Sequence, residues 1–244
     1  MMFKKKISIK ESNILIKAES RVYIEIARSI LLRERLFLEN YIRRHPEFLT
    51  SYKPLEVEED APRVVKLMAR SGWNADVGPM AAVAGSISQI IVEEVSKYGC
   101  RNIISNNGGD IALRSERDVV VGLYAGNSPL SGEIGFKIDR GAEGYGVCTS
   151  SGTVGHSVSF GNADAVVVFA EESSIADGAA TSIGNFAVGS PEEAINKCLE
   201  RAECIEGIDG VFVVVGEYAG KVGRIPKLVR TDKKVTYGEL FEMI

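Results

Sequence analysis

Between residues 100 and 169 the chain consists of short apolar runs separated by turns rich in glycine, asparagine and serine, and this alternation limits the fold more than any other feature. Short runs rich in valine and isoleucine, bounded by residues that favour turns, are typical of β-strands. The pattern predicts strands at 102–105, 111–113, 119–124, 134–138, 147–149 and 165–169. A sheet is therefore expected at the centre of this part of the chain.

Helical patterns precede and follow the predicted sheet. Apolar residues recur at helical spacing from Arg21 to Arg44, and Pro46 ends the pattern. Pro79 and Pro191 suit the first turn of a helix, where the missing N–H costs nothing. The predicted helices occupy 21–44, 63–70, 79–98, 173–186 and 191–201. A hairpin over 6–18, a strand over 211–215 and a hairpin remnant from residue 227 complete an α+β arrangement.

Length and composition exclude several classes of protein. With 244 residues, 45% of them hydrophobic, the chain can bury a full core, as one domain over 1–244 or as two similar halves of about 1–125 and 126–244. The 29 basic and 33 acidic residues are mixed along the sequence, so no surface for nucleic acid is expected. The cysteines form no CxxC pair, which argues against a zinc cage. Because neither a signal peptide nor an apolar run of membrane-spanning length is visible, a cytoplasmic protein with no membrane attachment is expected.

A glycine-rich turn between two predicted strands is the first candidate binding element. It consists of Asn106, Asn107, Gly108, Gly109 and Asp110. Paired glycines let the backbone turn tightly and bring its N–H groups close to a ligand, and Asp110 would hold a ribose or an amine. The same residues suit a type I′ hairpin turn, which favours Asn-Gly and Gly-Gly for its dihedral angles alone. Taken by itself, the turn favours the hairpin interpretation over the binding site.

A second candidate follows the strand predicted at 147–149. It contains Thr149, Ser150, Ser151 and Gly152, and His156 lies a few residues further on. Hydroxyl groups and a flexible glycine are typical of a phosphate-binding loop, and an imidazole can take a proton from a hydroxyl nucleophile near neutral pH. A histidine beside a strand is more often a structural residue, which leaves both interpretations open. Cys148, just before the loop, is predicted to be buried rather than reactive.

Asp177 and Thr181 form a third candidate. Their spacing places both side chains on one face of a helix, and the small residues between them leave that face uncrowded. A carboxylate and a hydroxyl are hard oxygen ligands, which suit Mg²⁺ because this ion keeps waters and takes further oxygens from phosphates. An aspartate near a helix N-terminus, followed by a threonine bonded to the preceding turn, is also an ordinary structural pattern, and spacing alone favours it.

A short internal similarity suggests a duplication. Residues 76–82 and 176–180 both place an aspartate and a glycine where a helix of small residues is predicted to start. Two such helix starts facing each other across one site would hold a charged ligand.

The order of these segments resembles the ApbE-like family, the FAD:protein FMN transferases formerly described as thiamine-biosynthesis lipoproteins. The family motif D-L-G-G-I-A-K-G is similar to residues 76–83, and N-L-G-G-D-I is similar to residues 106–111. The family motif T-S-G resembles residues 149–152, and A-D-x-x-A-T is reproduced without a change by residues 176–181. Four motifs in the same order along the chain make coincidence improbable.

The resemblance implies a fold, a cofactor set and a reaction. The implied fold is a duplicated, T-fold-like arrangement of antiparallel sheets with paired helices. Mg²⁺ would be held by Asp177, Thr181 and a backbone carbonyl around Ala81, and the diphosphate of a bound FAD, or the phosphate of FMN, would lie near it between the two candidate loops. The reaction would transfer FMN from FAD to a threonine or serine hydroxyl of an acceptor protein, with His156 as the best-placed base.

Departures from the family pattern motivate a second function. Ala82 replaces the motif lysine, and the family's D-P-x-T-G segment after its histidine is absent. The chain looks most like a compact cytoplasmic branch of the superfamily found in archaea and anaerobic bacteria, whose members are associated with incorporation of sulfide into homocysteine. The alternative is therefore an accessory protein of sulfide assimilation that keeps the scaffold without transferase activity. Formation of a homo-oligomer is left open by the sequence.

Overall fold

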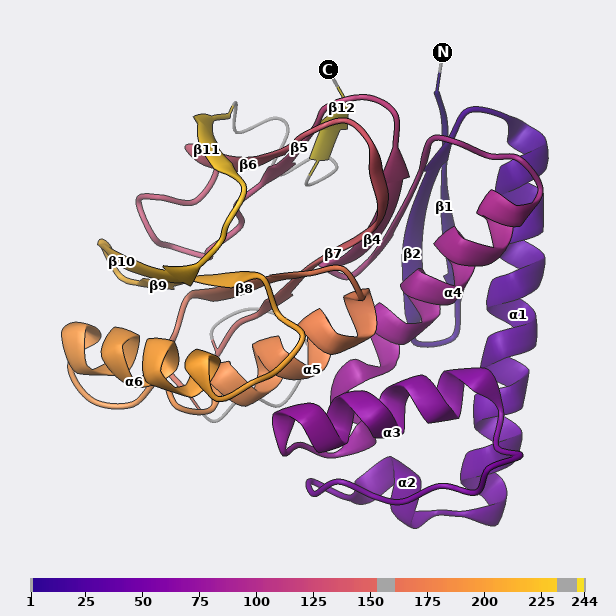
Figure 1. The fold of residues 1–244 in the computed structure, drawn as a ribbon, viewed down its shortest axis with the longest axis horizontal. Helices are drawn as coiled ribbons and strands as arrows, with labels where there is room; N and C mark the ends of the chain where they lie inside the picture. The colour runs from indigo at the N-terminus through magenta and orange to yellow at the C-terminus, as the bar shows by residue number, and fades with distance from the viewer. Residues whose placement is uncertain (1, 153–160, 232–240, 244) are drawn as a thin grey trace.

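The computed structural model describes residues 2–152, 161–231 and 241–243, which form two antiparallel sheets and the helices that cover them (Figure 1). The larger sheet has eight strands in the order β1-β2-β3-β4-β7-β8-β9-β10. These strands are β1 (Phe3–Ile9), β2 (Ser12–Ala18), β3 (Ile103–Asn107), β4 (Asp110–Ser115), β7 (Ala142–Ser150), β8 (Ala165–Ala170), β9 (Gly210–Val215) and β10 (Tyr218–Gly223). The four-stranded sheet contains β11 (Lys227–Arg230), β6 (Ile134–Ile138), β5 (Val119–Gly122) and β12 (Phe241–Met243), in that order.

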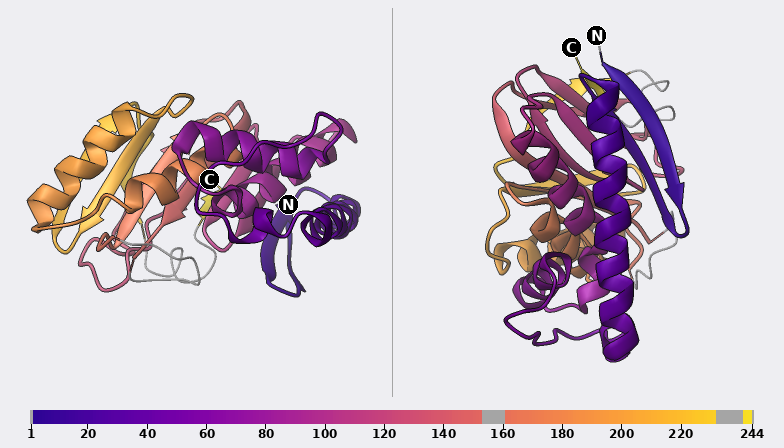
Figure 2. Two further views of the ribbon diagram at one scale, coloured as in Figure 1. Left: turned by 90° about the horizontal axis from the view of Figure 1, so that it is seen from below. Right: turned by 90° about the vertical axis from the view of Figure 1, so that its right-hand side faces the viewer.

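The helices lie on one side of the larger sheet and around its N-terminal hairpin (Figures 1 and 2). They are α1 (Arg21–Arg44), α2 (Glu47–Thr50), α3 (Arg63–Ala75), the 3₁₀ turn η1 (Pro79–Ala82), α4 (Val83–Lys97), α5 (Ser173–Gly184) and α6 (Pro191–Glu203). Among the described residues no single helix is both long and apolar enough to cross a membrane; α3 and the η1–α4 segment reach that length only together, and they are bent by 107°.

Three apolar clusters hold these layers together. An N-terminal core lies between the β1–β2 hairpin, α1, α3 and α4, and includes Ile14, Ile16, Leu31, Met68 and Ile91. A helix-side core lies between the larger sheet and α5 and α6, and includes Cys148, Val166, Val168, Ile183 and Cys198. An intersheet core fills the space between the two sheets, and includes Phe136, Val167, Phe169 and Phe212.

Strand β8 shows how the sequence produces this layering. Successive side chains of a strand point to opposite faces of the sheet. Val166 and Val168 therefore enter the helix-side core, whereas Val167 and Phe169 enter the intersheet core. Both faces are covered, and this is why β8 is apolar at every position.

Most predicted elements are confirmed. The helix over 21–44 and the strand over 134–138 have the predicted bounds, and the α+β class is correct. The helix predicted over 63–70 continues to Ala75, and the helix predicted from Pro79 begins with the 3₁₀ turn η1. Strand β10 and the short helix α2 were not predicted.

Only one of the two predicted helix starts is confirmed: Gly78 caps η1 and Pro79 is its first residue. Asp76 lies at the end of α3, in a left-handed conformation with φ of 50°. Its carboxylate is exposed and lies 3.6 Å from the Lys53 ammonium group. Asp177 lies within α5 rather than before it. The two segments therefore differ in position: residues 76–78 precede η1, whereas residues 176–180 lie inside α5.

Candidate functional site

The turn from Asn106 to Asp110 is a tight hairpin between β3 and β4. Asn107 pairs with Asp110 across the two strands, and both glycines of the loop have positive φ, 73° at Gly108 and 116° at Gly109. The Gly109 amide donates a hydrogen bond to the Asn106 side-chain oxygen over 2.9 Å. The hairpin interpretation of this turn is therefore right, and its conformation places Asp110 at the first position of β4.

Asp110 lies half-buried beside the end of β7. Its carboxylate accepts a hydrogen bond of 3.3 Å from the Thr149 amide. Burial raises the pKa of Asp110 to about 7, although the Thr149 amide and the Cys148 thiol partly oppose this shift. A carboxyl group with this pKa is poised to gain or lose a proton near neutral pH.

Asp177 approaches the same place from α5. Its side chain is 7% exposed, and its carboxylate accepts a hydrogen bond of 2.7 Å from the Gly85 amide at the start of α4. The positive end of a helix dipole favours a carboxylate, as do the Gly85 and Ala84 amides. Burial and the negative charge of Asp110 outweigh these contacts and raise the pKa of Asp177 well above its ordinary value.

Cys148 lies close enough to both carboxyl groups for its thiol to be affected by their charges. Its thiol is fully buried and donates a hydrogen bond of 3.3 Å to the Ser173 carbonyl oxygen at the start of α5. Burial raises the pKa of Cys148 well above its ordinary value, and the charges of Asp110 and Asp177 raise it further. The thiol is therefore held in its neutral form, as predicted for a buried cysteine, and it brings no nucleophile to the site.

Close packing of α4 against α5 fixes the position of Asp177. A Cβ atom added at Gly85 would lie 2.3 Å from the Ser173 carbonyl oxygen and 2.7 Å from the Asp177 Cβ. The Ser173 hydroxyl donates to the Gly85 carbonyl oxygen over 3.1 Å, and the Ser174 amide donates to the Gln89 side chain over 3.0 Å. Only a glycine at position 85 allows this approach without displacement of the backbone.

The donor atoms around Asp177 fit a hard divalent cation. Thr181 lies one turn further along α5 and is half-buried, and Ala81 of η1 packs against the helix-side core beneath α5. The influences that shift the pKa values of Asp110 and Asp177 include no lysine or arginine from the described residues. A divalent cation would supply the positive charge that the two carboxyl groups lack. Within the described ranges no cluster of three or more histidine, cysteine, aspartate or glutamate residues could hold a metal, so any such ion would take few ligands from the protein.

The described part of the second candidate loop, residues 149–152, lies at the end of β7. The Gly152 amide donates a hydrogen bond of 3.0 Å to the Ala163 carbonyl oxygen, so this N–H already has a protein partner. Ser150 is buried at the end of β7, and Ser151 is half-buried. His156 lies outside the described residues. The structure therefore places Thr149, but not the whole loop, against Asp110.

An apolar cavity of about 580 Å³ adjoins this site and was not foreseen from the sequence. It lies between the β1–β2 turn, α1, α2 and the start of α4, and both Asn107 and Ala84 line it. Its apolar lining comes from Leu38, Ile42, Leu49, Met80, Val83 and Ile87. Lys10 and Arg35 also line it, and they form ion pairs with Glu11 and Glu39 of the same wall. The only sequence signal for it was the apolar spacing of α1, which includes Phe37 or Leu38 and Ile42 but does not distinguish a cavity.

The amino-acid sequence of the chain matches a known family of proteins and several of its relatives. A family model described as "AbpE bacteria" matches residues 3–206. A UPF0280 protein of Methanococcus aeolicus is 64% identical over 248 residues, with 100% of both chains covered. A UPF0280 protein of Methanocaldococcus jannaschii is 54% identical over 246 residues, again with 100% of both chains covered.

Solved structures of flavin transferases have the same fold. The flavin transferase ApbE of Vibrio cholerae matches with a TM-score of 0.60 and 14% identity, over 93% of this chain and 97% of that one. The apo form of the flavinyl transferase ApbE of Pseudomonas stutzeri matches with a TM-score of 0.57 and 12% identity, over 98% of this chain and 97% of that one. These matches confirm the predicted ApbE-like fold.

Proposed function

This chain belongs to the AbpE bacteria family, and we propose that its Asp110–Asp177 site binds Mg²⁺ and FAD and transfers FMN to a hydroxyl group of an acceptor protein. One observation carries the proposal. Two carboxyl groups with raised pKa values, Asp110 and Asp177, meet beside a cavity without a compensating cationic side chain from the described residues. Such an arrangement is costly in an empty protein and favourable around a bound cation.

In this proposal Asp177, Thr181 and a backbone carbonyl around Ala81 hold the metal ion. When bound, Mg²⁺ neutralises charge on the diphosphate of the dinucleotide. The Gly85 and Ala84 amides keep the Asp177 carboxylate in one orientation. Because Asp177 is buried and fixed by packing, it can bind an ion without first losing side-chain freedom.

The flavin nucleotide would lie between the β3–β4 turn and the end of β7. In the proposal its phosphates contact the segment Asn106 to Asp110 and the segment Thr149 to Gly152. The adjoining cavity would accept one planar ring system, because a volume of about 580 Å³ and an apolar lining suit a drug-sized aromatic group. His156 is proposed as the base that takes the proton from the acceptor hydroxyl.

The test measures flavin binding and turnover separately. Purified protein is titrated with FAD, with and without Mg²⁺, and flavin fluorescence is recorded. It is then incubated with FAD, Mg²⁺ and acceptor polypeptides rich in serine and threonine, and AMP and protein-bound flavin are measured. We expect Asp177→Asn to abolish AMP release, whereas Asp76→Asn, at the exposed aspartate of the other motif, should leave it unchanged. Absence of FAD binding under all conditions would exclude the transferase.

The accessory role in sulfide assimilation has one structural observation in its favour. Ala82 is fully buried at the end of η1, where the family motif has a lysine, so this position supplies no ammonium group to the site. A deletion strain grown on sulfide as the sole sulfur source distinguishes the two functions. Complementation by the Asp177→Asn variant would favour an accessory scaffold, and normal growth of the deletion strain would count against the accessory role.

A further inference from the structure

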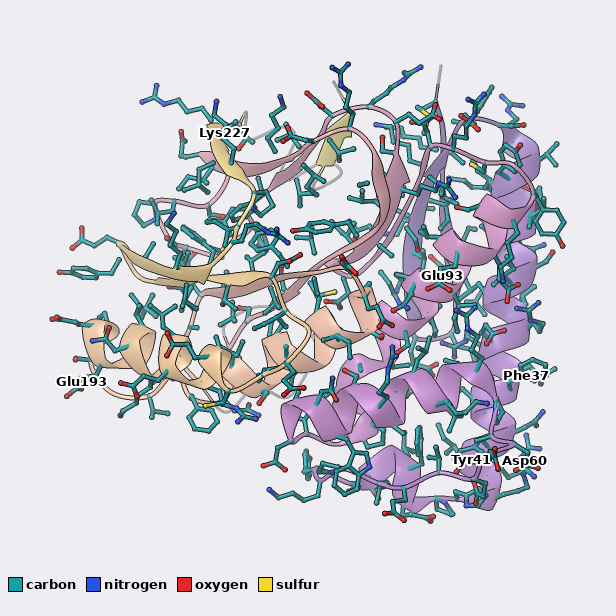
Figure 3. The ribbon with its side chains drawn as sticks, viewed as in Figure 1. Phe37, Tyr41, Asp60, Glu93, Glu193 and Lys227 are labelled. Carbon is teal, nitrogen blue, oxygen red and sulfur yellow. The ribbon has the colours of Figure 1, made fainter. Side chains whose placement is uncertain are left out.

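The outer face of α1 carries several exposed apolar residues among charged ones. The exposed apolar residues are Val22, Leu32, Leu36 and Phe37, of which Phe37 is labelled in Figure 3. Ile24, Leu31 and Leu38 point into the N-terminal core, as expected for an amphipathic helix. On the opposite side, Val22 is 64% exposed and Leu36 is 55% exposed. The helix runs along the outside of the molecule, as the right-hand view of Figure 2 shows. Its 24 residues correspond to a length of about 36 Å.

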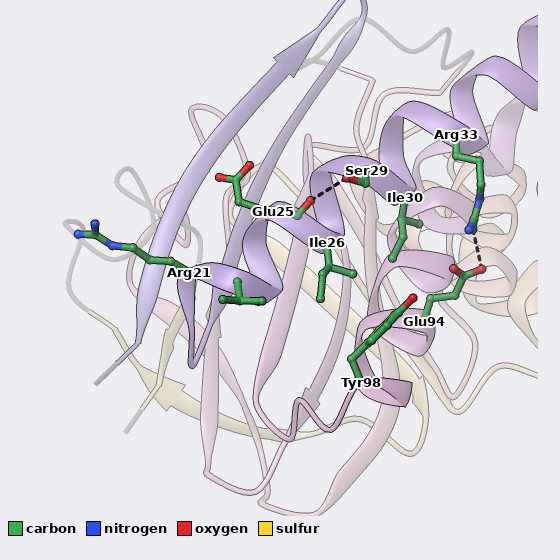
Figure 4. A pocket seen from close by; sticks show the side chains of 9 residues that line it. Arg21, Glu25, Ile26, Ser29, Ile30, Arg33, Glu94 and Tyr98 are labelled. Atoms are coloured by element: carbon green, nitrogen blue, oxygen red, sulfur yellow. Dashed lines mark hydrogen bonds and ion pairs between the residues drawn. The ribbon is translucent and has the colours of Figure 1, made fainter.

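A groove runs beside the first half of this face. It has a volume of about 630 Å³ and lies between α1 and the end of α4 (Figure 4). Val22, Ile26 and Ile30 line it from α1, and Tyr98 lines it from the end of α4. An ion pair of 2.7 Å between Arg33 and Glu94 borders it. The groove is therefore an apolar hollow with charged residues at its border.

The exposed residues of α1 are spaced so that two copies of the helix could pair in antiparallel orientation. Val22, Ser29 and Leu36 are seven residues apart and share one line along the helix. If a second copy of α1 packs antiparallel with Ser29 opposite Ser29, then Val22 lies opposite Leu36 and Glu25 lies opposite Arg33, each twice. Apolar residues thus meet apolar residues, and opposite charges meet.

The centre of the pattern is suited to close helix packing. Ser29 has a small side chain, and its hydroxyl donates to the Glu25 carbonyl oxygen over 3.1 Å, so it needs no outside partner (Figure 4). Glu25 is exposed and pairs with Lys5. Arg33 pairs over 2.7 Å with both Glu94 and the buried Glu34. The exposed Lys5–Glu25 pair contributes little, so Glu25 can turn to a cation of a second copy. Arg33 would keep its bond to Glu34 and offer its remaining guanidinium donors across the interface.

We propose that the outer face of α1 joins two copies of this chain about a twofold axis that passes Ser29. A twofold interface presents the same patch on both partners, and the reversed pairing of this helix provides such a patch. Leu36 and Phe37 of one copy pack beside the groove at Val22 and Tyr98 of the other, and the reverse contact forms at the same time. The association does not depend on the function of the Asp110–Asp177 site.

Light scattering coupled to size exclusion, together with sedimentation, tests the association. The full chain is expected to have twice the mass of its 26.4 kDa protomer. Leu36→Lys should raise the dissociation constant at least about tenfold, because a charge would enter the apolar contact. Leu228→Lys, at a residue 41% exposed on β11, is the matched control and should not change it. A wild-type chain that stays monomeric up to about 100 µM would overturn the proposal, as would a dimer that Leu36→Lys leaves intact.

A cysteine placed on the axis gives a second, independent measurement. The exposed Cys204 is first replaced by serine. Ser29→Cys should then form a disulfide-linked dimer under mild oxidation, because the two copies of residue 29 face each other. Arg43→Cys on the same helix should not, because the two copies of residue 43 would be about 42 Å apart. Equal cross-linking at the two positions would contradict the antiparallel pairing even if a dimer forms.

Discussion

Asp110 and Asp177 lie in one site, where burial makes both harder to ionise and the charge of Asp110 adds to the effect at Asp177. Asp177 is buried and receives the Gly85 amide, and Asp110 receives the Thr149 amide. These neutral donors reduce the cost of a buried carboxylate without removing it. A bound cation would change this balance, and so would the loss of either acid.

Replacement of Asp177 by asparagine should remove Mg²⁺ binding without lowering the stability of the metal-free protein. The variant should melt at or above the wild-type temperature without metal, because a neutral amide can accept the Gly85 hydrogen bond without the penalty of a buried charge. Wild type should gain about 2.7 kcal/mol when Mg²⁺ is present at a hundred times its dissociation constant, and the variant should gain nothing. Calorimetry in EDTA and in MgCl₂ measures both values. Asp76→Asn serves as the control, and an unchanged Mg²⁺ response in Asp177→Asn would remove Asp177 from the metal site.

The raised pKa of Asp110 predicts how the free energy of unfolding depends on pH in the absence of metal. Its pKa is about 7 in the folded protein and has the ordinary value of 3.8 in the unfolded chain. Between these values the folded protein holds a proton that the unfolded chain has released, so this group makes stability fall as the pH rises and has no further effect above about pH 7. Asp110→Asn should flatten the profile in this window. Urea unfolding across the window measures it, with Asp139→Asn, at an exposed position, as the control; equal slopes in wild type and Asp110→Asn would contradict the prediction.

The sequence could identify the two acids but not what surrounds them. Asp110 and Asp177 stood in motifs that could be read along the chain. Gly85, by contrast, lies 92 positions before Asp177 and touches it only because two helices cross. Ser173 was seen as a helix start, and nothing near it in the sequence indicates that its carbonyl group meets the Cys148 thiol. Contacts of this kind depend on tertiary packing and have no local signal.

The contact between α4 and α5 connects the site to the rest of the fold. The start of α4 supplies the amides that hold Asp177, and the start of α5 also packs against β7, where a Cβ atom at Gly146 would lie 2.5 Å from the Ser173 Cα. Small residues at these crossings let the helices and the sheet approach to backbone contact. The site is therefore a property of how these elements pack, and not of one loop.

Gly85→Ala tests this packing. In an ordinary helix the change would stabilise by about 1 kcal/mol, because alanine has the higher helix propensity. Here the new methyl group would meet the Ser173 carbonyl oxygen and the Asp177 side chain, so we expect a loss of about 1–3 kcal/mol from overpacking. Urea unfolding gives the free energy, and Mg²⁺ titration should show weaker binding because Asp177 has moved. A variant as stable as wild type or more so would mean that α4 and α5 do not approach as closely as described.

Elements with strong periodicity were predicted well, and weakly patterned ones were not. The α1 helix has regular apolar spacing and ends just before Pro46, so its bounds could be predicted correctly. Strand β10 has one glycine in its interior, Gly220, and one at its end, Gly223. It is largely exposed because it forms the edge of the larger sheet. Its pairing with β9, and not its own sequence, makes it a strand.

At the level of the whole molecule, the larger sheet connects the N-terminal core to the other two. Strands β3 and β4 lie between the hairpin that covers the N-terminal core and the strands β7 and β8 that cover the helix-side core. Helices α4 and α5 join the same two cores on the other side. We propose on these grounds that the chain unfolds as one cooperative domain; the relation of its two halves by duplication stays a prediction.

The cysteines of this chain can report on that cooperativity because they lie in different cores. Cys100 belongs to the N-terminal core, Cys148 and Cys198 belong to the helix-side core, and Cys204 is exposed. Burial raises the pKa of Cys100 to about 11 and that of Cys198 to about 12, so little thiolate is present at neutral pH. A disulfide reagent should therefore label Cys204 alone in the native protein. As urea is raised, peptide mass spectrometry should find that the other three become reactive at one common midpoint, since continuous sheet and helix contacts make the loss of one core expose the other. If Cys100 became reactive at clearly lower urea than Cys148 and Cys198, the N-terminal core would be a separate unit, and the chain would have to be described as two domains.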